Sequence, residues 1–149
     1  MPIKSFAGML QEDDIQKINL STNDGSIGYK IHKFQGMPFD TGGAVNTANE
    51  AVLKIFSIPQ TAASQDVDFS DQTLLGVVYF LRDQGVVAVT SDTIIFDNKI
   101  FNQDIFVTYA DAQTNTKGFN YYIELEQVRL DLNEATVATL QDIRNITSG

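Results

Sequence analysis

Histidine chemistry in this chain rests on one residue, His32, and thiol chemistry is excluded because the sequence contains no cysteine. A Ser-His-Asp triad needs a histidine as its base and a nucleophile held within reach of it. Nothing around His32 resembles the sharp turn that presents a nucleophilic serine. His32 falls in an expected strand, opposite the apolar face, where a solvated or hydrogen-bonded strand residue is the ordinary interpretation. We therefore predict no catalytic residue.

A pair of carboxylates, Glu124 and Glu126, lies two residues apart in an expected strand and therefore on one face of it. Glycoside hydrolysis uses two carboxyl groups roughly 5–9.5 Å apart, and such a pair is roughly 6.5–7 Å apart at the backbone. Tyr122 beside them would offer a ring on which a sugar can stack. Alternating glutamates more often keep a sheet face or edge hydrated, and we expect that role here.

Oxygen ligands alternate along the acidic segment that contains Asp66, Asp68, Ser70 and Asp71, as they do in calcium sites. The segment lacks the sixth-position glycine and the distal glutamate of the helix-loop-helix calcium motif. The alternative is a solvated loop in which Asp and Ser side chains bond the backbone and shape turns. The usual zinc ligand sets and a glycine-rich phosphate loop are also missing. The sequence therefore predicts no metal and no cofactor.

Apolar residues recur with a period of two along most of the chain, which is typical of strands with one buried face. Residues 18–20 and 27–31, joined by the turn signal Asp24-Gly25, predict a hairpin. Residues 36–49 are rich in Gly, Thr and Asn and predict a long loop. The further expected strands are 52–58, 73–81, 86–90, 93–96, 104–109 and 119–132.

Two of these segments carry additional signals. Residues 73–81 are apolar on both faces, which suits a central strand covered on both sides. In 119–132, the apolar positions occupy one face as far as Leu125 and the other face from Val128 onward. A slip of one residue reverses every side chain, so we expect a bulge near Glu126-Gln127.

The end of the chain changes character. Asp131 and Glu134 have the spacing of a capping box, and apolar residues then recur every third position at Val137, Leu140 and Ile143. This pattern predicts a short helix within 133–146, with an extended arm as the alternative.

Taken together, these patterns predict an all-β fold. Strands of this number and spacing indicate a jelly-roll-like β-sandwich of about seven or eight strands with a short C-terminal helix. The 149 residues fit a single domain, 1–149, that can bury a core without a disulfide or a metal.

The charge of the chain argues against two classes of partner. Asp and Glu number 19 against 10 Lys and Arg, for a net charge of -9. Nucleic acid and anionic membranes attract clustered cations, whereas the cations here are scattered, so we expect neither partner. The longest apolar run, 74–81, is far shorter than the roughly 20 residues of a membrane helix. No signal-peptide pattern is present, so we expect synthesis in the cytoplasm as a soluble protein.

Two apolar clusters fall where no strand pattern explains them, one near the N-terminus and one in or beside the expected 36–49 loop. Their members are Ile3, Phe6, Met9, Phe34, Met37 and Phe39. We hypothesise that residues 1–10 form an arm and that both clusters contact a partner. The alternatives are an edge strand for 1–10 and a loop that packs onto its own domain.

Five stretches of the chain carry a family resemblance: 1–8 (MPIKSFAG), 21–29 (STNDGSIGY), 95–105 (IFDNKIFNQDI), 120–126 (NYYIELE) and 130–146. In them the chain resembles small virion structural proteins of marine tailed bacteriophages. The resemblance covers most of the chain and contains no catalytic motif, so it assigns no site residue. It implies a capsid decoration (cement) protein that binds the shell through apolar loops or arms, or a minor tail or head-to-tail connector component.

This resemblance also implies partners and a location. The partners would be the major capsid protein or other virion subunits, with a homo-oligomer or symmetric array in the particle. The protein would be made in the host cytoplasm and function in the virion rather than as an enzyme. A glycan- or receptor-binding β-sandwich of a tail is the alternative, and it would expose aromatic rings near Tyr109, Tyr121 or Tyr122.

Overall fold

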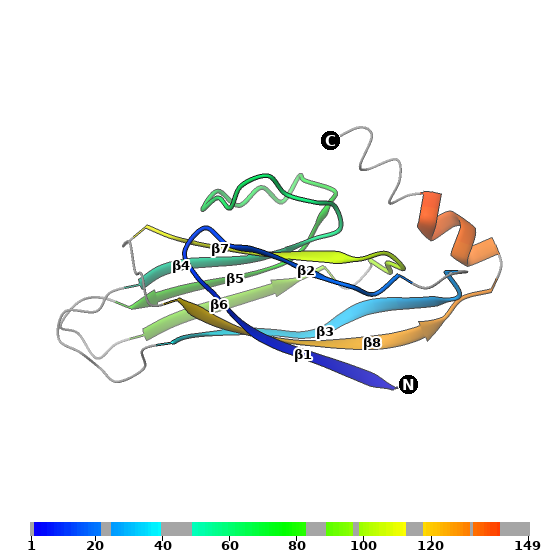
Figure 1. The fold of residues 1–149 in the computed structure, drawn as a ribbon, viewed down its shortest axis with the longest axis horizontal. Coiled ribbons are helices and arrows are strands. Elements are labelled where there is room, and N and C mark those ends of the chain that lie inside the picture. Colours follow the sequence, from blue (N-terminus) through cyan, green and yellow to red (C-terminus); the bar gives the residue numbers. More distant parts are fainter. Residues whose placement is uncertain are drawn as a thin grey trace.

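The computed structural model describes residues 2–21, 25–39, 49–82, 89–96, 99–112, 118–131 and 133–140. Its strands are β1 (Ile3–Leu10), β2 (Ile15–Ile18), β3 (Ile27–Pro38), β4 (Asn49–Phe56), β5 (Leu74–Arg82), β6 (Val89–Ile95), β7 (Ile105–Asp111) and β8 (Phe119–Arg129). They form two antiparallel sheets, β1-β8-β3 and β2-β7-β4-β5-β6, which pack face to face (Figure 1). A helix covers residues 133–140. The predicted all-β sandwich with a short C-terminal helix is confirmed.

The strand order is that of a jelly roll with one departure. Winding the pairs 1-8, 2-7, 3-6 and 4-5 of an eight-stranded jelly roll gives the sheets 1-8-3-6 and 2-7-4-5. The protein keeps β1-β8-β3 and β2-β7-β4-β5, but β6 pairs with β5 instead of β3. One sheet therefore widens to five strands, and β3 becomes an edge of the three-stranded sheet.

The core lies between the two sheets and draws large side chains from both of them. Phe119 of β8 lies with its ring centroid 5.3 Å from Phe80 of β5 and 5.3 Å from Tyr109 of β7. Leu53 and Ile55 of β4 are fully buried beside this aromatic group. Each side chain of this size contributes about 1.5–3 kcal/mol when it is removed from water, so this cluster fixes how the sheets face each other.

The five-stranded sheet is also covered on its outer face. The loop of residues 57–73 crosses that face between β4 and β5 (Figure 1). Lys54 of β4 is buried beneath this loop, where its Nζ donates a hydrogen bond to the Asp66 carbonyl oxygen at 2.7 Å. Because the loop covers β5 from outside, its apolar residues are buried or half-buried on both faces, as the sequence predicts.

The hairpin expected around Asp24-Gly25 is wrong. β2 pairs with β7 and β3 pairs with β8, so the two strands belong to different sheets. Residues 22–24 of the expected turn lie outside the described residues. Alternation in the sequence identifies the buried face of a strand but not its partner, and here a jelly-roll crossing follows β2.

The predicted bulge is also misplaced. β8 runs without interruption past Glu126, and the register shift lies in β3 between Ile31 and Lys33. His32 is the extra residue, because Ile31 faces Leu125 and Lys33 faces Glu124. A bulge in the central strand β8 would disturb two ladders, whereas a bulge in the edge strand β3 disturbs one.

Glycine at position 36 has a packing role rather than a turn role. Of the expected loop 36–49, residues 36–38 belong to β3 and Asn49 to β4, and residues 40–48 lie outside the described residues. A Cβ atom on Gly36 would lie 2.5 Å from Leu53 Cδ1 and 2.7 Å from Phe119 Cε1. Of the strands expected at 86–90 and 93–96, residues 89–90 and 93–95 belong to one strand, β6, and residues 86–88 lie outside the described residues.

The capping box at the C-terminal helix is present as predicted. The Glu134 N–H donates to Asp131 Oδ1 at 2.7 Å, and the Asp131 N–H donates to Glu134 Oε1 at 3.3 Å. The helix packs through Ala135, while Val137 and Leu140 of the predicted apolar stripe are 64% and 57% exposed. Residues 141–146 of the predicted helix lie outside the described residues.

Candidate functional site

His32 lies exposed at the bulge of β3. It lines a shallow hollow of about 290 Å³ together with Lys30, Ile31, Ile95 and Glu126. None of these four neighbours carries a hydroxyl or thiol that the imidazole could activate as in a Ser-His or Cys-His pair.

Glu124 and Glu126 share the outer face of the three-stranded sheet and take part in surface contacts there. Glu126 forms an ion pair with Lys30 of β3 at 3.5 Å. Glu124 accepts a hydrogen bond from the Tyr122 hydroxyl at 3.0 Å, and this bond raises the pKa of Tyr122. Each carboxylate therefore bonds a different neighbour on its own sheet.

The acidic loop uses its carboxylates to shape turns. Asp68 Oδ1 accepts hydrogen bonds from the N–H and the hydroxyl of Ser70, and these bonds lower the pKa of Asp68. Asp71 Oδ1 accepts the same pair of bonds from Thr73, at 2.8 and 2.6 Å. Across the described residues, no three His, Asp or Glu side chains gather into a metal-binding group. The turn-shaping interpretation accounts for Asp68 and Asp71.

The six predicted contact residues divide between surface and core. Ile3, Met9, Met37 and Phe39 are exposed, and Phe6 is half-buried against the core. The expectation that Phe34 faces a partner is wrong, because its side chain is 1% exposed between the sheets. The bulge at His32 shifts the phase of β3 and turns Phe34 inward. Residues 3–10 likewise form the edge strand β1, paired with β8, instead of an arm.

Met9, Met37 and Phe39 gather at one end of the three-stranded sheet, whereas Ile3 lies opposite Glu126 toward the other end. Met9 and Met37 flank Asn120 in one cross-strand row, and residues directly opposite each other share a face. Tyr122 lies in the next row along β8. Phe39 continues β3 by donating its N–H to the Gly118 carbonyl oxygen at 3.2 Å. We call Met9, Met37, Phe39 and Tyr122 the outer-face patch.

A hollow adjoins this patch. It lies between β3 and β6, the two strands that would pair in a complete jelly roll. The edge of β3 and the inner face of β6 border this hollow, which has a volume of about 360 Å³. Met37 and Tyr122 of the outer-face patch line it together with Gln35, Ser91 and Thr93. We call this hollow the seam, and it combines apolar side chains with amide and hydroxyl groups.

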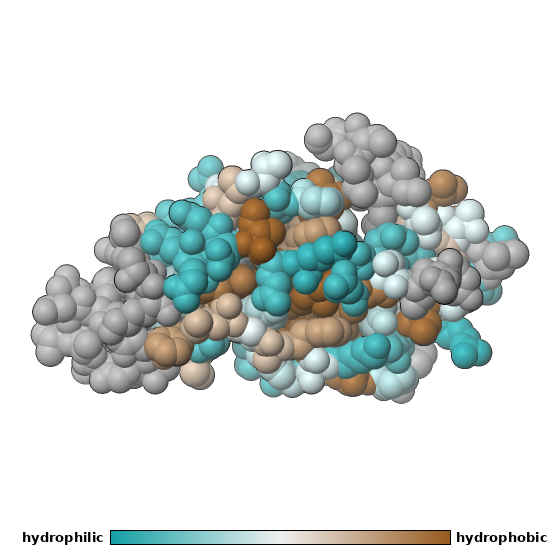
Figure 2. All heavy atoms as spheres, viewed as in Figure 1, coloured by the Kyte–Doolittle hydropathy of each residue, from teal (hydrophilic) through white to brown (hydrophobic). Residues whose placement is uncertain are grey.

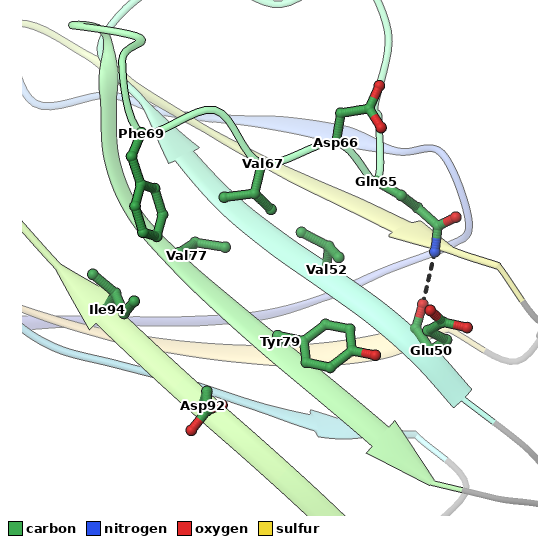
Figure 3. A pocket seen from close by; sticks show the side chains of 10 residues that line it. All are labelled: Glu50, Val52, Gln65, Asp66, Val67, Phe69, Val77, Tyr79, Asp92 and Ile94. Carbon is green, nitrogen blue, oxygen red and sulfur yellow. Dashed lines mark hydrogen bonds between the residues drawn. The ribbon is translucent and has the colours of Figure 1, made fainter.

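A third hollow is a groove on the opposite side of the sandwich, with a volume of about 460 Å³ (Figure 3). Its floor is the outer face of the five-stranded sheet, where Tyr79 lies opposite Val52 of β4 and Asp92 of β6. Val67 and Phe69 of the 57–73 loop form its wall. The groove was not predicted from the sequence, although Val67 and Phe69 alternate with acidic residues in the same loop.

The groove is held open by contacts of the loop with the sheet. Lys54 Nζ lies 5.3 Å from the Phe56 ring centroid as well as bonding the Asp66 carbonyl oxygen. Burial lowers the pKa of Lys54, and the charges of Asp66 and Asp71 oppose that effect. On the other side, the Phe69 ring packs edge-on against Phe96 at 5.5 Å. These contacts join the wall to the sheet on both sides of the groove.

Tyrosines expected on a glycan-binding surface are mostly inside the protein. The Tyr109 hydroxyl donates to Asp111 Oδ2 at 2.8 Å, and the Tyr121 hydroxyl donates to Gln16 Oε1 at 2.8 Å. Both rings are buried, so that expectation is wrong for Tyr109 and Tyr121. Tyr122 alone among the three is exposed, within the outer-face patch.

Comparison of the chain with protein-family models, with curated proteins and with solved structures finds no match in any of the three. The fold and the surfaces described above therefore carry the functional argument. Within the described residues, no helix has both the length and the apolar character to cross a membrane.

Proposed function

We propose that this protein is a structural component of a bacteriophage virion, a capsid decoration protein that binds neighbouring subunits through the outer-face patch. The observation that carries the proposal is the exposure of four large apolar side chains together at one end of a sheet. Met37 and Phe39 are 59% and 58% exposed. Contiguous apolar side chains of this kind are typical of protein contact sites.

The chemistry of the patch suits a contact with another protein surface. Methionine side chains are flexible and polarizable, so Met9 and Met37 can adapt to a neighbouring subunit. Tyr122 offers a ring whose hydroxyl already bonds Glu124. The adjoining seam supplies hydrogen-bonding groups, so an apolar contact would have a polar rim, as protein interfaces do.

Charges along the same sheet face would orient the partner. Beyond the patch, the next cross-strand rows contain Lys33 beside Glu124 and Lys30 beside Glu126. The face therefore changes from apolar at one end to charged at the other. Complementary charges at the rim of an interface fix its register more than they increase its affinity.

The resemblance to tailed-phage virion proteins supports the virion as the setting. A shell repeats its subunits by symmetry, so a modest contact area in each copy gives a large total area. The partners that we propose are the major capsid protein and neighbouring copies of this chain. A binding role rather than a catalytic one also fits the contacts of Glu124, Glu126 and Asp68, which stabilise the surface and the turns.

Binding of purified protein to phage shells that lack it tests this proposal. Met37→Glu places a charge in the outer-face patch at an exposed position, and we expect shell binding to weaken by about tenfold or more. Val137→Glu is the matched control, because Val137 is exposed on the C-terminal helix, which follows the end of β8 opposite to the patch (Figure 1). Equal shell binding by the two folded variants, measured by co-sedimentation, would contradict the proposal.

A further inference from the structure

The groove under the 57–73 loop combines an apolar lining with negative charge. Val67 and Phe69 of the wall face Val77 and Ile94 of the floor (Figure 3). Tyr79 lies along the floor, and its ring extends toward Glu50 (Figure 3). Such a channel suits a ligand that has a long apolar stem and a polar head.

Carboxylates stand on both sides of the Tyr79 ring. Asp92 is the direct cross-strand partner of Tyr79 in the β5–β6 ladder, so its side chain shares that face of the sheet. Glu50 lies two residues before Val52 on β4, on the same outer face. The carboxylate of Asp66, the third acidic lining residue, turns away from the floor (Figure 3).

Positive charge is missing from the lining of the groove. None of the ten residues that line it is a lysine or an arginine. The nearby ammonium of Lys54 is buried beneath the loop and bonds the Asp66 carbonyl oxygen. An anionic ligand would meet Glu50 and Asp92 unpaired, whereas a cation would pair with both.

We propose that this groove binds an arginine side chain that projects from a segment of a partner protein. The aliphatic stem lies between Phe69 and Ile94, and the guanidinium stacks on the Tyr79 ring between Glu50 and Asp92. A guanidinium is planar, stacks on aromatic rings and pairs with carboxylates, so it matches this arrangement better than an ammonium does. The groove lies on the other side of the sandwich from the outer-face patch, and the inference does not depend on the virion role.

A short peptide provides the direct test. The probe is acetyl-Gly-Leu-Arg-Leu-Gly-amide, titrated into ¹⁵N-labelled full-length protein at low salt. We expect backbone amide shifts at Val52, Val67, Phe69 and Asp92, with a dissociation constant on the order of 1 mM. The matched peptide carries citrulline, a neutral isostere, in place of arginine, and we expect it to bind about tenfold more weakly.

Charge-removing variants separate this groove from general attraction to an acidic protein. Asp92→Asn and Glu50→Gln should each weaken arginine-peptide binding by about fivefold. Glu124→Gln removes the same charge from the opposite face of the sandwich and should leave binding within about twofold. All three positions are on the surface, so circular dichroism and thermal unfolding can verify that each variant is folded.

Several results would overturn the inference. They are shifts of the same size with the citrulline peptide, equal weakening by Glu124→Gln and Asp92→Asn, and absence of shifts in the groove at millimolar arginine peptide. Shifts confined to the outer-face patch would also overturn it, since the peptide would then bind the other face. These outcomes concern the groove alone and leave the shell-binding experiment to decide the proposed function.

Discussion

Asp104, just before β7, accepts a hydrogen bond from the Leu20 main-chain N–H at 2.7 Å, although the two residues are 84 positions apart. The same Oδ1 accepts the Ser21 N–H at 2.9 Å, and Oδ2 forms an ion pair with Lys17 at 3.3 Å. This carboxylate fixes the chain where it leaves β2 to cross to the other sheet. The sequence pattern predicted a hairpin turn after β2, but the chain here is held by Asp104 instead.

The contacts of Asp104 predict a loss of stability in acid. Burial raises the pKa of Asp104, but hydrogen bonds from Ser21 and Leu20 and the contact with Lys17 outweigh it and lower the pKa below its usual value. Because the folded pKa is below the unfolded value of about 4, this stabilisation is complete above that pH and is lost as pH falls through the lowered pKa.

The variant Asp104→Asn isolates this contribution. It keeps an acceptor oxygen but loses the charge, so we expect the free energy of unfolding to fall by about 1–2 kcal/mol at neutral pH. The difference from the parent protein should shrink as the pH falls through the lowered pKa of Asp104. Urea unfolding at a series of pH values measures both, and a deficit that stays constant with pH would refute this role of the charge.

Glycine at position 36 allows the close approach of β3 to the core, which predicts a large cost for one methyl group. Gly36→Ala places a Cβ 2.5 Å from Leu53 Cδ1, so we expect a loss of about 1–3 kcal/mol. Gly76→Ala is the control, because its Cβ would meet its nearest neighbours at 3.5 Å, an ordinary contact. We expect that variant to be neutral or more stable by up to about 1 kcal/mol. Chemical unfolding of both proteins should show this contrast, and equal stabilities would refute it.

The buried amide of Asn102 joins the C-terminal helix to the sandwich. Its Nδ2 donates to the Gly25 carbonyl oxygen at 3.2 Å, the Ala135 carbonyl oxygen at 3.3 Å and the Thr139 hydroxyl at 2.8 Å. Asn102→Ala should therefore cost about 2–3 kcal/mol and speed amide hydrogen exchange in residues 133–140. The neighbouring Gln103→Ala removes a long 3.4 Å bond and should change little. Unchanged exchange in the helix of the Asn102 variant would contradict the assignment.

The capping box predicts a smaller effect at the start of the helix. Asp131→Ala removes the acceptor of the Glu134 N–H, so helix stability should fall by about 1 kcal/mol. Asn133→Ala, at an exposed position in the first turn, keeps the cap and improves helix propensity, so it should be neutral or slightly stabilising. Circular dichroism during thermal unfolding distinguishes the two, and the reverse order of stabilities would argue against the cap.

Local patterns in the sequence were sufficient for the strands and for the capping box, because both depend on residues close together in the chain. The apolar run of 73–81 predicted a strand covered on both sides, and β5 is that strand. Pairing partners were beyond reach, since alternation is the same whichever strand lies alongside. The bulge at His32 was not predicted because it lies at the end of the expected strand. The buried residue that reveals the change of phase, Phe34, lies beyond that end, beside the expected loop.

The candidate sites depended on longer-range arrangements. Met37 and Phe39 are exposed, whereas Phe34, grouped with them in the sequence, is buried because the bulge at His32 changes the phase of β3. Prediction of the groove would have required the position of the 57–73 loop, which folds back over β5 and places Phe69 near Ile94. Figure 2 shows that hydrophobic residues lie among hydrophilic ones on one face of the molecule. The amino-acid composition of a segment therefore does not predict whether its apolar residues form a contact surface.

The central claim, a decoration role in the virion, is tested most directly by counting copies of this protein in purified particles with quantitative mass spectrometry. The account predicts many copies, comparable to the number of major capsid subunits, because a decoration protein repeats with the shell. A few copies per particle would place the protein in the tail or neck instead. Its absence from particles, together with abundance in infected cells, would contradict the structural role altogether.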